Sequence, residues 1–174
     1  MERFVRHGKD TKNMSRTKSD KGSTTLISIA MGILFIIIPL SPLLNYINFG
    51  LINNEIIGIA GILIGLWGLF VRYLAFKTLG RFFTRTLREV DEHKLVTDGI
   101  YHYIRHPGYL SDILIFTGAG LAMGNLIPII GVSVLFLIAY PYRIHVEEKM
   151  LTEMFGEEYI AYKKASRRLI PYIY

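Results

Sequence analysis

Cysteine is absent from this 174-residue chain, and its absence excludes several kinds of chemistry. Without a thiol the protein has no disulfide, no thiolate nucleophile and no cysteine-based metal site. The sequence also lacks a P-loop, a Gly-rich Rossmann turn, an H-E-x-x-H motif and a G-x-S-x-G nucleophile elbow. Its five histidines do not follow zinc-type spacing, so we predict no metal site.

Charge is scarce in four apolar runs, where Arg72 and Asp112 are the only charged residues; the runs cover residues 24–44, 56–76, 108–123 and 126–142. The first two are long enough to cross a hydrocarbon core of about 30 Å as helices. The last two are short, and only Gly124 and Asn125 separate them, which indicates a tight helical hairpin. The sequence therefore predicts an all-α polytopic membrane protein with about four transmembrane helices, including a C-terminal hairpin.

The second run contains glycines at spacings of three and four residues, which are Gly58, Gly61, Gly65 and Gly68. This spacing places them on one face of a helix, as expected for close helix packing in lipid. Arg72 falls near the end of the run, where its side chain can snorkel to the interface. Asp112 should face the protein interior or the interface rather than lipid.

All 20 Lys and Arg residues lie outside the two short connections at 45–55 and 124–125. They occupy residues 1–23, the end of the second run, and the segments 77–107 and 143–174. The positive-inside rule then predicts that both termini and the middle segment are cytoplasmic. We expect a basic N-terminal segment (1–23) near anionic membrane lipids, followed by a membrane domain (24–174). Membrane topology accounts for the net charge of +6, so we do not expect nucleic-acid binding.

One polar cluster covers residues 93–109, directly before the third apolar run. Asp98-Gly99 indicates a turn, and His106-Pro107-Gly108 predicts a non-helical entry into the following helix. Backbone amides at that helix N-terminus are natural donors for a polar or anionic group. A membrane-interface belt would enrich the same Tyr and Arg residues, and the pattern alone leaves both interpretations open.

A second polar cluster covers residues 143–162, after the fourth apolar run. Arg143 and Glu147 are four residues apart and share a helix face. They form either an ordinary surface ion pair or a charged pair at a binding site, and composition does not choose between these. Gly156 predicts a break, with a second helix over residues 157–165.

The two clusters, in this order and with a helical hairpin between them, make the chain resemble the isoprenylcysteine carboxyl methyltransferase family. The resemblance extends from Leu79-Gly80 to Pro171 and rests on HKLVTDGIYHYIRHPGYL and RIHVEEKMLTEMFGEEYIAYKK…RLIP. That family belongs to a group of membrane methyltransferases that includes phospholipid N-methyltransferases. The resemblance implies S-adenosylmethionine as cofactor, bound at cytoplasmic segments, and a lipophilic substrate that enters from the bilayer.

The resemblance also implies roles for individual residues. Arg143 and Arg105 would be catalytic: Arg143 would face the substrate, and Arg105 would brace the pocket or assist the substrate. The cofactor-binding residues would be His93, Lys94, Leu95, Val96, Tyr101, His106, Pro107, Gly108, Tyr109 and Glu147. The chain departs from some eukaryotic members at Thr86, where they have a Gln that contacts the cofactor.

The function we predict is S-adenosylmethionine-dependent carboxyl O-methylation of an isoprenylcysteine-like or other lipophilic substrate. A carboxylate is ionised at neutral pH and needs no general base. A phospholipid or small lipophilic amine or thiol is the alternative acceptor, and His106 or Glu147 would then remove a proton from an amine. An NADPH-dependent membrane reductase and a non-catalytic membrane binding protein are the competing classes.

Overall fold

The computed structural model describes residues 22–80 and 95–170. Within these ranges the chain forms helices and no named strand, which confirms the predicted all-α class. The helices of the bundle are α2 (Ser23–Tyr46), α3 (Glu55–Leu79), α4 (Pro107–Ala122), α5 (Leu126–Val134) and α6 (Tyr140–Phe155). The other elements are the 3₁₀ helix η2 (Gly99–His102), the π-helical segment η3 (Leu135–Ala139) and α7 (Glu157–Ala165).

Three helices of the described chain are long and apolar enough to cross a membrane: α2, α3 and the continuous stretch Leu126–Phe155. This last stretch is 30 residues long and joins α5, η3 and α6. We expected the fourth span to end at Tyr142, but the helix continues through Arg143 and Glu147 to Phe155. The hydropathy of the sequence shows where a helix leaves the membrane, not where the helix ends. This helix ends before Gly156, whose φ is +57°.

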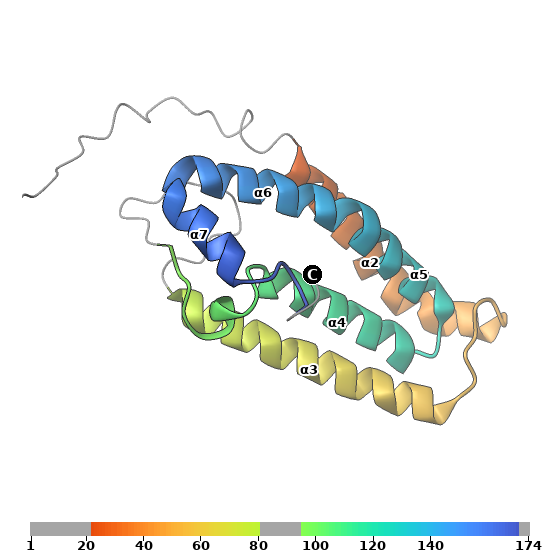
Figure 1. The fold of residues 1–174 in the computed structure, drawn as a ribbon. Coiled ribbons are helices and arrows are strands. Elements are labelled where there is room, and N and C mark those ends of the chain that lie inside the picture. Colours follow the sequence, from red (N-terminus) through yellow and green to blue (C-terminus); the bar gives the residue numbers. More distant parts are fainter. Residues whose placement is uncertain (1–21, 81–94, 171–174) are drawn as a thin grey trace, which may run out of the picture.

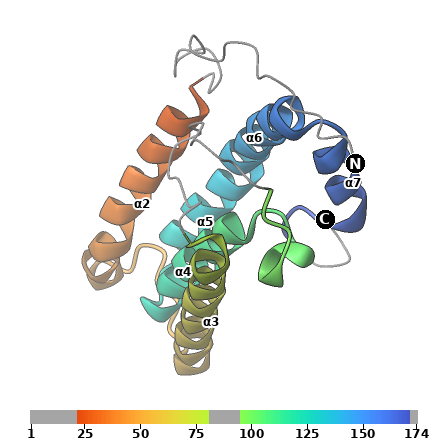
Figure 2. The same ribbon diagram turned by 90° about the vertical axis from the view of Figure 1, so that its left-hand side faces the viewer.

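Helix α4 has 16 residues, is shorter than these three helices, and lies alongside α3 (Figure 1). It packs against α3 and connects to α5 through the turn at Gly124. The predicted C-terminal hairpin is thus formed by α4 and α5. Figure 2 shows α4 and α5 in the middle of the molecule, with α2 on one side and α7 on the other.

The glycine face of α3 packs against α4. A carbon added at Gly61 would lie 2.5 Å from the backbone nitrogen of Ala122, and one added at Gly68 would lie 2.8 Å from that of Ile115. Gly65 meets Gly118 of α4 in the same interface. The predicted close packing is confirmed at these three positions, and it makes α3 and α4 antiparallel neighbours. Gly58 has open space around it and does not take part.

A polar contact also joins α3 to α4. The Arg72 guanidinium pairs with Asp112 and donates to the Ser111 hydroxyl at 3.4 Å. Asp112 is buried, as predicted. The Arg72 side chain remains 34% exposed, and the sequence did not indicate its partner on α4.

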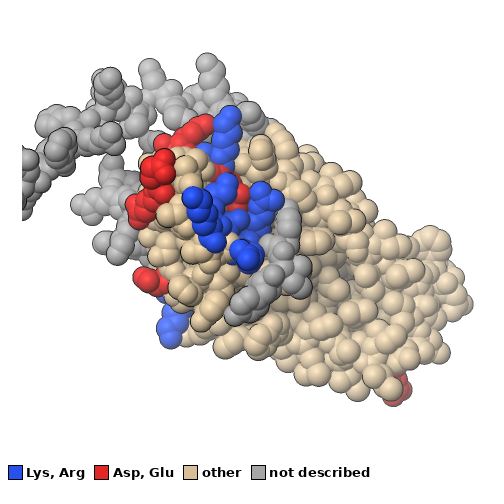
Figure 3. Space-filling model, viewed as in Figure 1, with Lys and Arg blue, Asp and Glu red and all other residues tan. Residues whose placement is uncertain are grey.

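The two short connections lie together at one end of the molecule. The nitrogen of Ile52 donates to the Gly124 carbonyl at 2.7 Å, and the buried Asn125 amide donates to the Asn45 side chain at 2.7 Å. Nearly all charged side chains gather at the opposite end on the face shown in Figure 3. The bundle therefore has one end built of turns and one charged end, as the distribution of Lys and Arg predicts.

Candidate functional site

The charged end is built from segments that are far apart in the sequence: the N-termini of α2 and α4, helix α6, and α7 with the residues after it. Gly99 has a φ of +56°, a left-handed conformation that glycine adopts readily, and it starts η2. His106 precedes α4 in a non-helical conformation, and Pro107 occupies the first turn of the helix. Both predicted backbone features are confirmed, and together they turn residues 98–106 across the end of the bundle.

The segment after α7 runs beside residues 103–106. The Arg105 nitrogen donates to the Arg167 carbonyl at 2.7 Å, and the His106 nitrogen donates to the Arg168 carbonyl at 3.0 Å. In return, the Arg167 nitrogen donates to the Tyr103 carbonyl at 3.0 Å. These bonds explain why α7 folds back under α6 (Figure 1), and they fix the entry to α4 from the C-terminal side.

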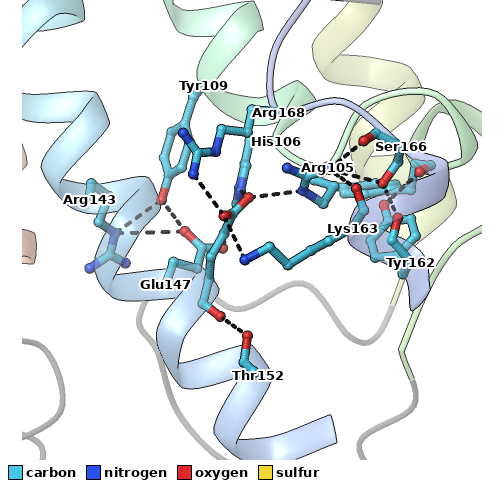
Figure 4. A network of polar contacts seen from close by, with 12 residues as sticks. Arg105, His106, Tyr109, Arg143, Glu147, Thr152, Tyr162, Lys163, Ser166 and Arg168 are labelled. Carbon is cyan, nitrogen blue, oxygen red and sulfur yellow. Dashed lines mark hydrogen bonds and ion pairs between the residues drawn. The ribbon is translucent and has the colours of Figure 1, made fainter. Parts of the chain in front are cut away.

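Arg143, Tyr109 and Glu147 form a continuous hydrogen-bonded chain (Figure 4). The Arg143 Nε donates to the Tyr109 hydroxyl at 3.0 Å, and that hydroxyl donates to the Glu147 Oε2 at 2.6 Å. The direct distance from Arg143 Nε to Glu147 Oε2 is 3.9 Å. A tyrosine of α4 thus bridges a cation and an anion that lie one turn apart on α6.

Helix α2 holds the other edge of the Arg143 guanidinium. The Nη1 atom donates to the Ser23 hydroxyl at 2.8 Å and to the Thr24 hydroxyl at 2.9 Å. Arg143 is only 6% exposed. The arrangement excludes an ordinary surface pair with Glu147, which was one of the two interpretations that the sequence left open.

Glu148, the next residue along α6, is the centre of a second charged cluster. Its side chain is 4% exposed, and it pairs with Arg105 at 2.9 Å, with Arg168 at 3.4 Å and with Lys163 at 3.5 Å. Three cations from three segments therefore surround one buried carboxylate. We did not predict Glu148 as a site residue, because its partners are distant in the sequence and it stands directly beside Glu147.

Arg105 contacts α6 through its Nε and the C-terminal part of the chain through its Nη1. Besides Glu148, it donates to the carbonyls of Lys163 and Ser166 and to the Ser166 hydroxyl. A further bond of 2.6 Å joins the Tyr162 hydroxyl to the Tyr101 carbonyl. Burial raises the pKa of Tyr162 to about 12, so this hydroxyl stays protonated at neutral pH and donates. These contacts tie the segment before α4 to the C-terminal part of the chain.

His106 lies between the two carboxylates of α6. Its Nδ1 is 3.9 Å from Glu147, and its Nε2 is 3.5 Å from Glu148 without forming a hydrogen bond within the described chain. The imidazole stacks on the Tyr109 ring with a centroid separation of 5.6 Å. His106 is therefore a buried side chain that lies between the Glu147 and Glu148 clusters.

The remaining predicted site residues are near this cluster or outside the described chain. Pro107 and Tyr101 are buried, whereas Leu95, Val96 and Gly108 are partly buried. His93, Lys94 and Thr86 lie outside the described residues. The structure thus brings together the predicted residues Tyr101, Arg105, His106, Tyr109, Arg143 and Glu147, and it adds Glu148, Ser23 and Thr24.

Comparison with known proteins gives a consistent result. The model of the isoprenylcysteine carboxyl methyltransferase (ICMT) family matches residues 61–153, which include α4 and most of α6. A probable protein-S-isoprenylcysteine O-methyltransferase of Oryza sativa subsp. indica is 32% identical over 115 residues, 65% of this chain and 60% of that protein. Protein-S-isoprenylcysteine O-methyltransferase B of Arabidopsis thaliana is 30% identical over 154 residues, 87% of this chain and 78% of its own length.

A solved structure has the same fold. The eukaryotic intramembrane Ras methyltransferase ICMT superimposes with a TM-score of 0.70 at 25% sequence identity, over 84% of this chain and 52% of that one. This chain covers 60% of the rice protein and 46% of the relative from Dictyostelium discoideum. With its membrane-spanning helices and the order of its two polar clusters, this integral membrane protein belongs to the isoprenylcysteine carboxyl methyltransferase family.

Proposed function

We propose that the protein transfers a methyl group from S-adenosylmethionine to the carboxylate of an isoprenylcysteine-like or other lipophilic molecule. The observation that carries this proposal is the chain of contacts from Arg143 through Tyr109 to Glu147 at the charged end of a membrane-spanning helix. One end of the chain is cationic and suits an anionic acceptor. The other end is anionic and suits a cofactor that carries an ammonium group.

The side chains around Glu147 fit S-adenosylmethionine. The Glu147 side chain is 22% exposed and accepts one hydrogen bond from Tyr109, so its carboxylate has further acceptor positions for an ammonium group. The backbone at the start of α4 offers N–H donors for the cofactor's carboxylate. His106 and Tyr109 present aromatic rings. When bound, the cofactor supplies a methyl group that its sulfonium already activates.

We assign the cofactor contacts to the residues that the family resemblance implies: His93, Lys94, Leu95, Val96, Tyr101, His106, Pro107, Gly108, Tyr109 and Glu147. Arg105 acts on this set indirectly. Its ion pair with Glu148 and its bonds to Ser166 hold the segment before α4 against the C-terminal segment. We therefore propose that Arg105 positions the site rather than touching the acceptor.

Arg143 is the residue proposed to hold the acceptor. A guanidinium recognises a carboxylate through paired N–H donors, and a carboxylate is already ionised at neutral pH. The protein then needs no general base. Its contribution is to align the acceptor oxygen with the methyl group and to exclude water, which supplies several kcal/mol in well-oriented reactions, roughly 7–11 kcal/mol at most. An amine acceptor fits less well, because Arg143 would repel its protonated form.

The membrane delivers the lipophilic part of the acceptor. Helices α2 and α3 expose apolar side chains along their length, including Phe35, Ile36 and Ile59, which suits contact with lipid. A prenyl or acyl tail enters from the bilayer while the water-soluble cofactor enters from the charged end. We propose that this end and both termini are cytoplasmic, with the basic segment 1–23 near anionic lipids.

The experiment compares variants of the full chain in detergent or lipid. Arg143→Ala should abolish transfer of radiolabelled methyl groups to a prenylcysteine analogue while largely sparing calorimetric binding of S-adenosylhomocysteine. Lys149→Ala is the matched control, because it removes a cation from the same helix and the Lys149 side chain is 59% exposed. Full activity of the Arg143 variant would overturn the proposal. Stabilisation by NADPH in place of S-adenosylhomocysteine would indicate a reductase instead.

A further inference from the structure

The first turn of α2 contributes two hydroxyl groups to the charged end. Both the Ser23 and the Thr24 hydroxyl accept a hydrogen bond from the Arg143 Nη1, at 2.8 and 2.9 Å. Ser23 is completely buried. The two residues precede Arg143 by 120 and 119 positions. This contact therefore joins the start of the described chain to the residue that we propose binds the acceptor.

These hydrogen bonds hold the guanidinium from a second side. Tyr109 of α4 contacts the Nε edge, and α2 contacts Nη1, so two helices define the plane of a rigid planar group. All three oxygens belong to neutral hydroxyls. They orient the Arg143 guanidinium through hydrogen bonds, and its Nε also lies 3.9 Å from the Glu147 Oε2.

We propose that Ser23 and Thr24 are positioning residues for the acceptor: they hold the Arg143 guanidinium in the orientation that receives the acceptor carboxylate. This inference rests on the proposed role of Arg143. Both residues act through that side chain and not on the methyl group. Helix α2, outside the stretch at 61–153 that the family model matches, thereby becomes part of the acceptor site.

Helix α2 does not depend on these hydroxyls for its place in the bundle. Leu34 is 2% exposed and belongs to the core that includes Val132 and Leu135. The ring of the next residue, Phe35, packs edge-on against Phe116 of α4, with 5.6 Å between the ring centroids. Because this apolar packing lies several turns from Ser23, removing the hydroxyls should alter the orientation of Arg143 and leave the fold intact.

The test measures kcat and KM for a prenylcysteine analogue together with calorimetric affinity for S-adenosylhomocysteine. Ser23→Ala and Thr24→Val should each lower kcat/KM for the acceptor roughly tenfold, as expected for losing a hydrogen bond to a charged group. Affinity for S-adenosylhomocysteine should stay at the wild-type value. The conservative variants Ser23→Thr and Thr24→Ser keep the hydroxyl and should retain most of the activity.

Ser41→Ala is the matched control, because Ser41 is also a buried serine of α2 but donates within its own helix, to the Ile37 carbonyl. It should behave as wild type. Wild-type kcat/KM in the Ser23→Ala/Thr24→Val double variant, with Arg143→Ala inactive, would overturn the inference and leave the proposed function standing. A parallel loss of cofactor affinity, or an equal loss in Ser41→Ala, would also overturn it. Full activity of Arg143→Ala would overturn both this inference and the proposed function.

Discussion

Replacing Glu148 with Gln removes the negative charge at the centre of the buried cluster that joins α6 to the C-terminal segment. The Glu148 side chain is 4% exposed and that of its partner Arg105 is 7% exposed. Gln keeps the shape and one acceptor oxygen, so the change isolates the charge. Arg105 would remain buried beside a neutral group, without the carboxylate that now compensates it.

The expected loss follows from how deeply each partner is buried. Breaking a buried ion pair by removing one charge costs about 3–5 kcal/mol. The side chains of Lys163 and Arg168 are both 37% exposed, so water screens their charges. Losing either ion pair with Glu148 therefore adds at most about 1 kcal/mol to the destabilisation. The Ser166 carbonyl continues to accept from Arg105. We therefore expect Glu148→Gln to lower the free energy of unfolding by about 3 kcal/mol, the lower end of the range.

Reversible denaturant titration in mixed micelles measures this difference. Glu153→Gln is the matched control: it removes the same charge from the same helix, where the side chain is 58% exposed, and it should change stability by at most about 0.5 kcal/mol. Because Arg105 precedes His106 at the entry to α4, Glu148→Gln should also weaken binding of S-adenosylhomocysteine. Equal stability of the two variants would refute the argument that this cluster fastens the C-terminal segment.

Two further predictions concern the helix interface and the cofactor. Gly61→Ala should destabilise the protein by about 1–3 kcal/mol, because its new carbon would meet the α4 backbone at 2.5 Å. Gly58→Ala, three residues earlier in open space, should instead be neutral or stabilise the helix by up to about 1 kcal/mol; the same titration compares them, and the same sign for both would contradict the packing. Glu147→Ala should weaken S-adenosylhomocysteine binding at least roughly tenfold by calorimetry, as loss of a charge-assisted hydrogen bond requires. Unchanged affinity would remove Glu147 from the cofactor site.

Local signals predicted the backbone features of the site well. Pro107 marked the start of α4, Gly156 marked the break before α7, and the structure gives that helix the predicted bounds, Glu157–Ala165. These signals act through the chain's own conformation, since proline fixes φ and glycine permits positive φ. The glycine spacing in α3 also predicted a close helix contact, although the sequence did not indicate that Gly58 lies beyond its edge.

Partners that lie far apart in the sequence could not be read from it. Glu147 and Glu148 are adjacent acids, and only the fold shows that one meets Tyr109 and the other meets Arg105. Ser23 stands at the boundary of an apolar run, where a serine carries no particular signal. Arg72 likewise pairs with Asp112, a residue 40 positions later. Contacts between residues far apart in the sequence decided each of these positions.

The central claim is that the acceptor atom is a carboxylate oxygen held by Arg143. The most direct measurement incubates the full chain with methyl-labelled S-adenosylmethionine, a prenylcysteine analogue and a membrane phospholipid extract, and then treats the labelled product with base. Base hydrolyses a methyl ester to volatile methanol, whereas a methyl group on nitrogen or sulfur is retained. We predict label in the prenylcysteine analogue, released by base and absent with Arg143→Ala. Base-stable label, or label confined to the phospholipid extract, would contradict this account.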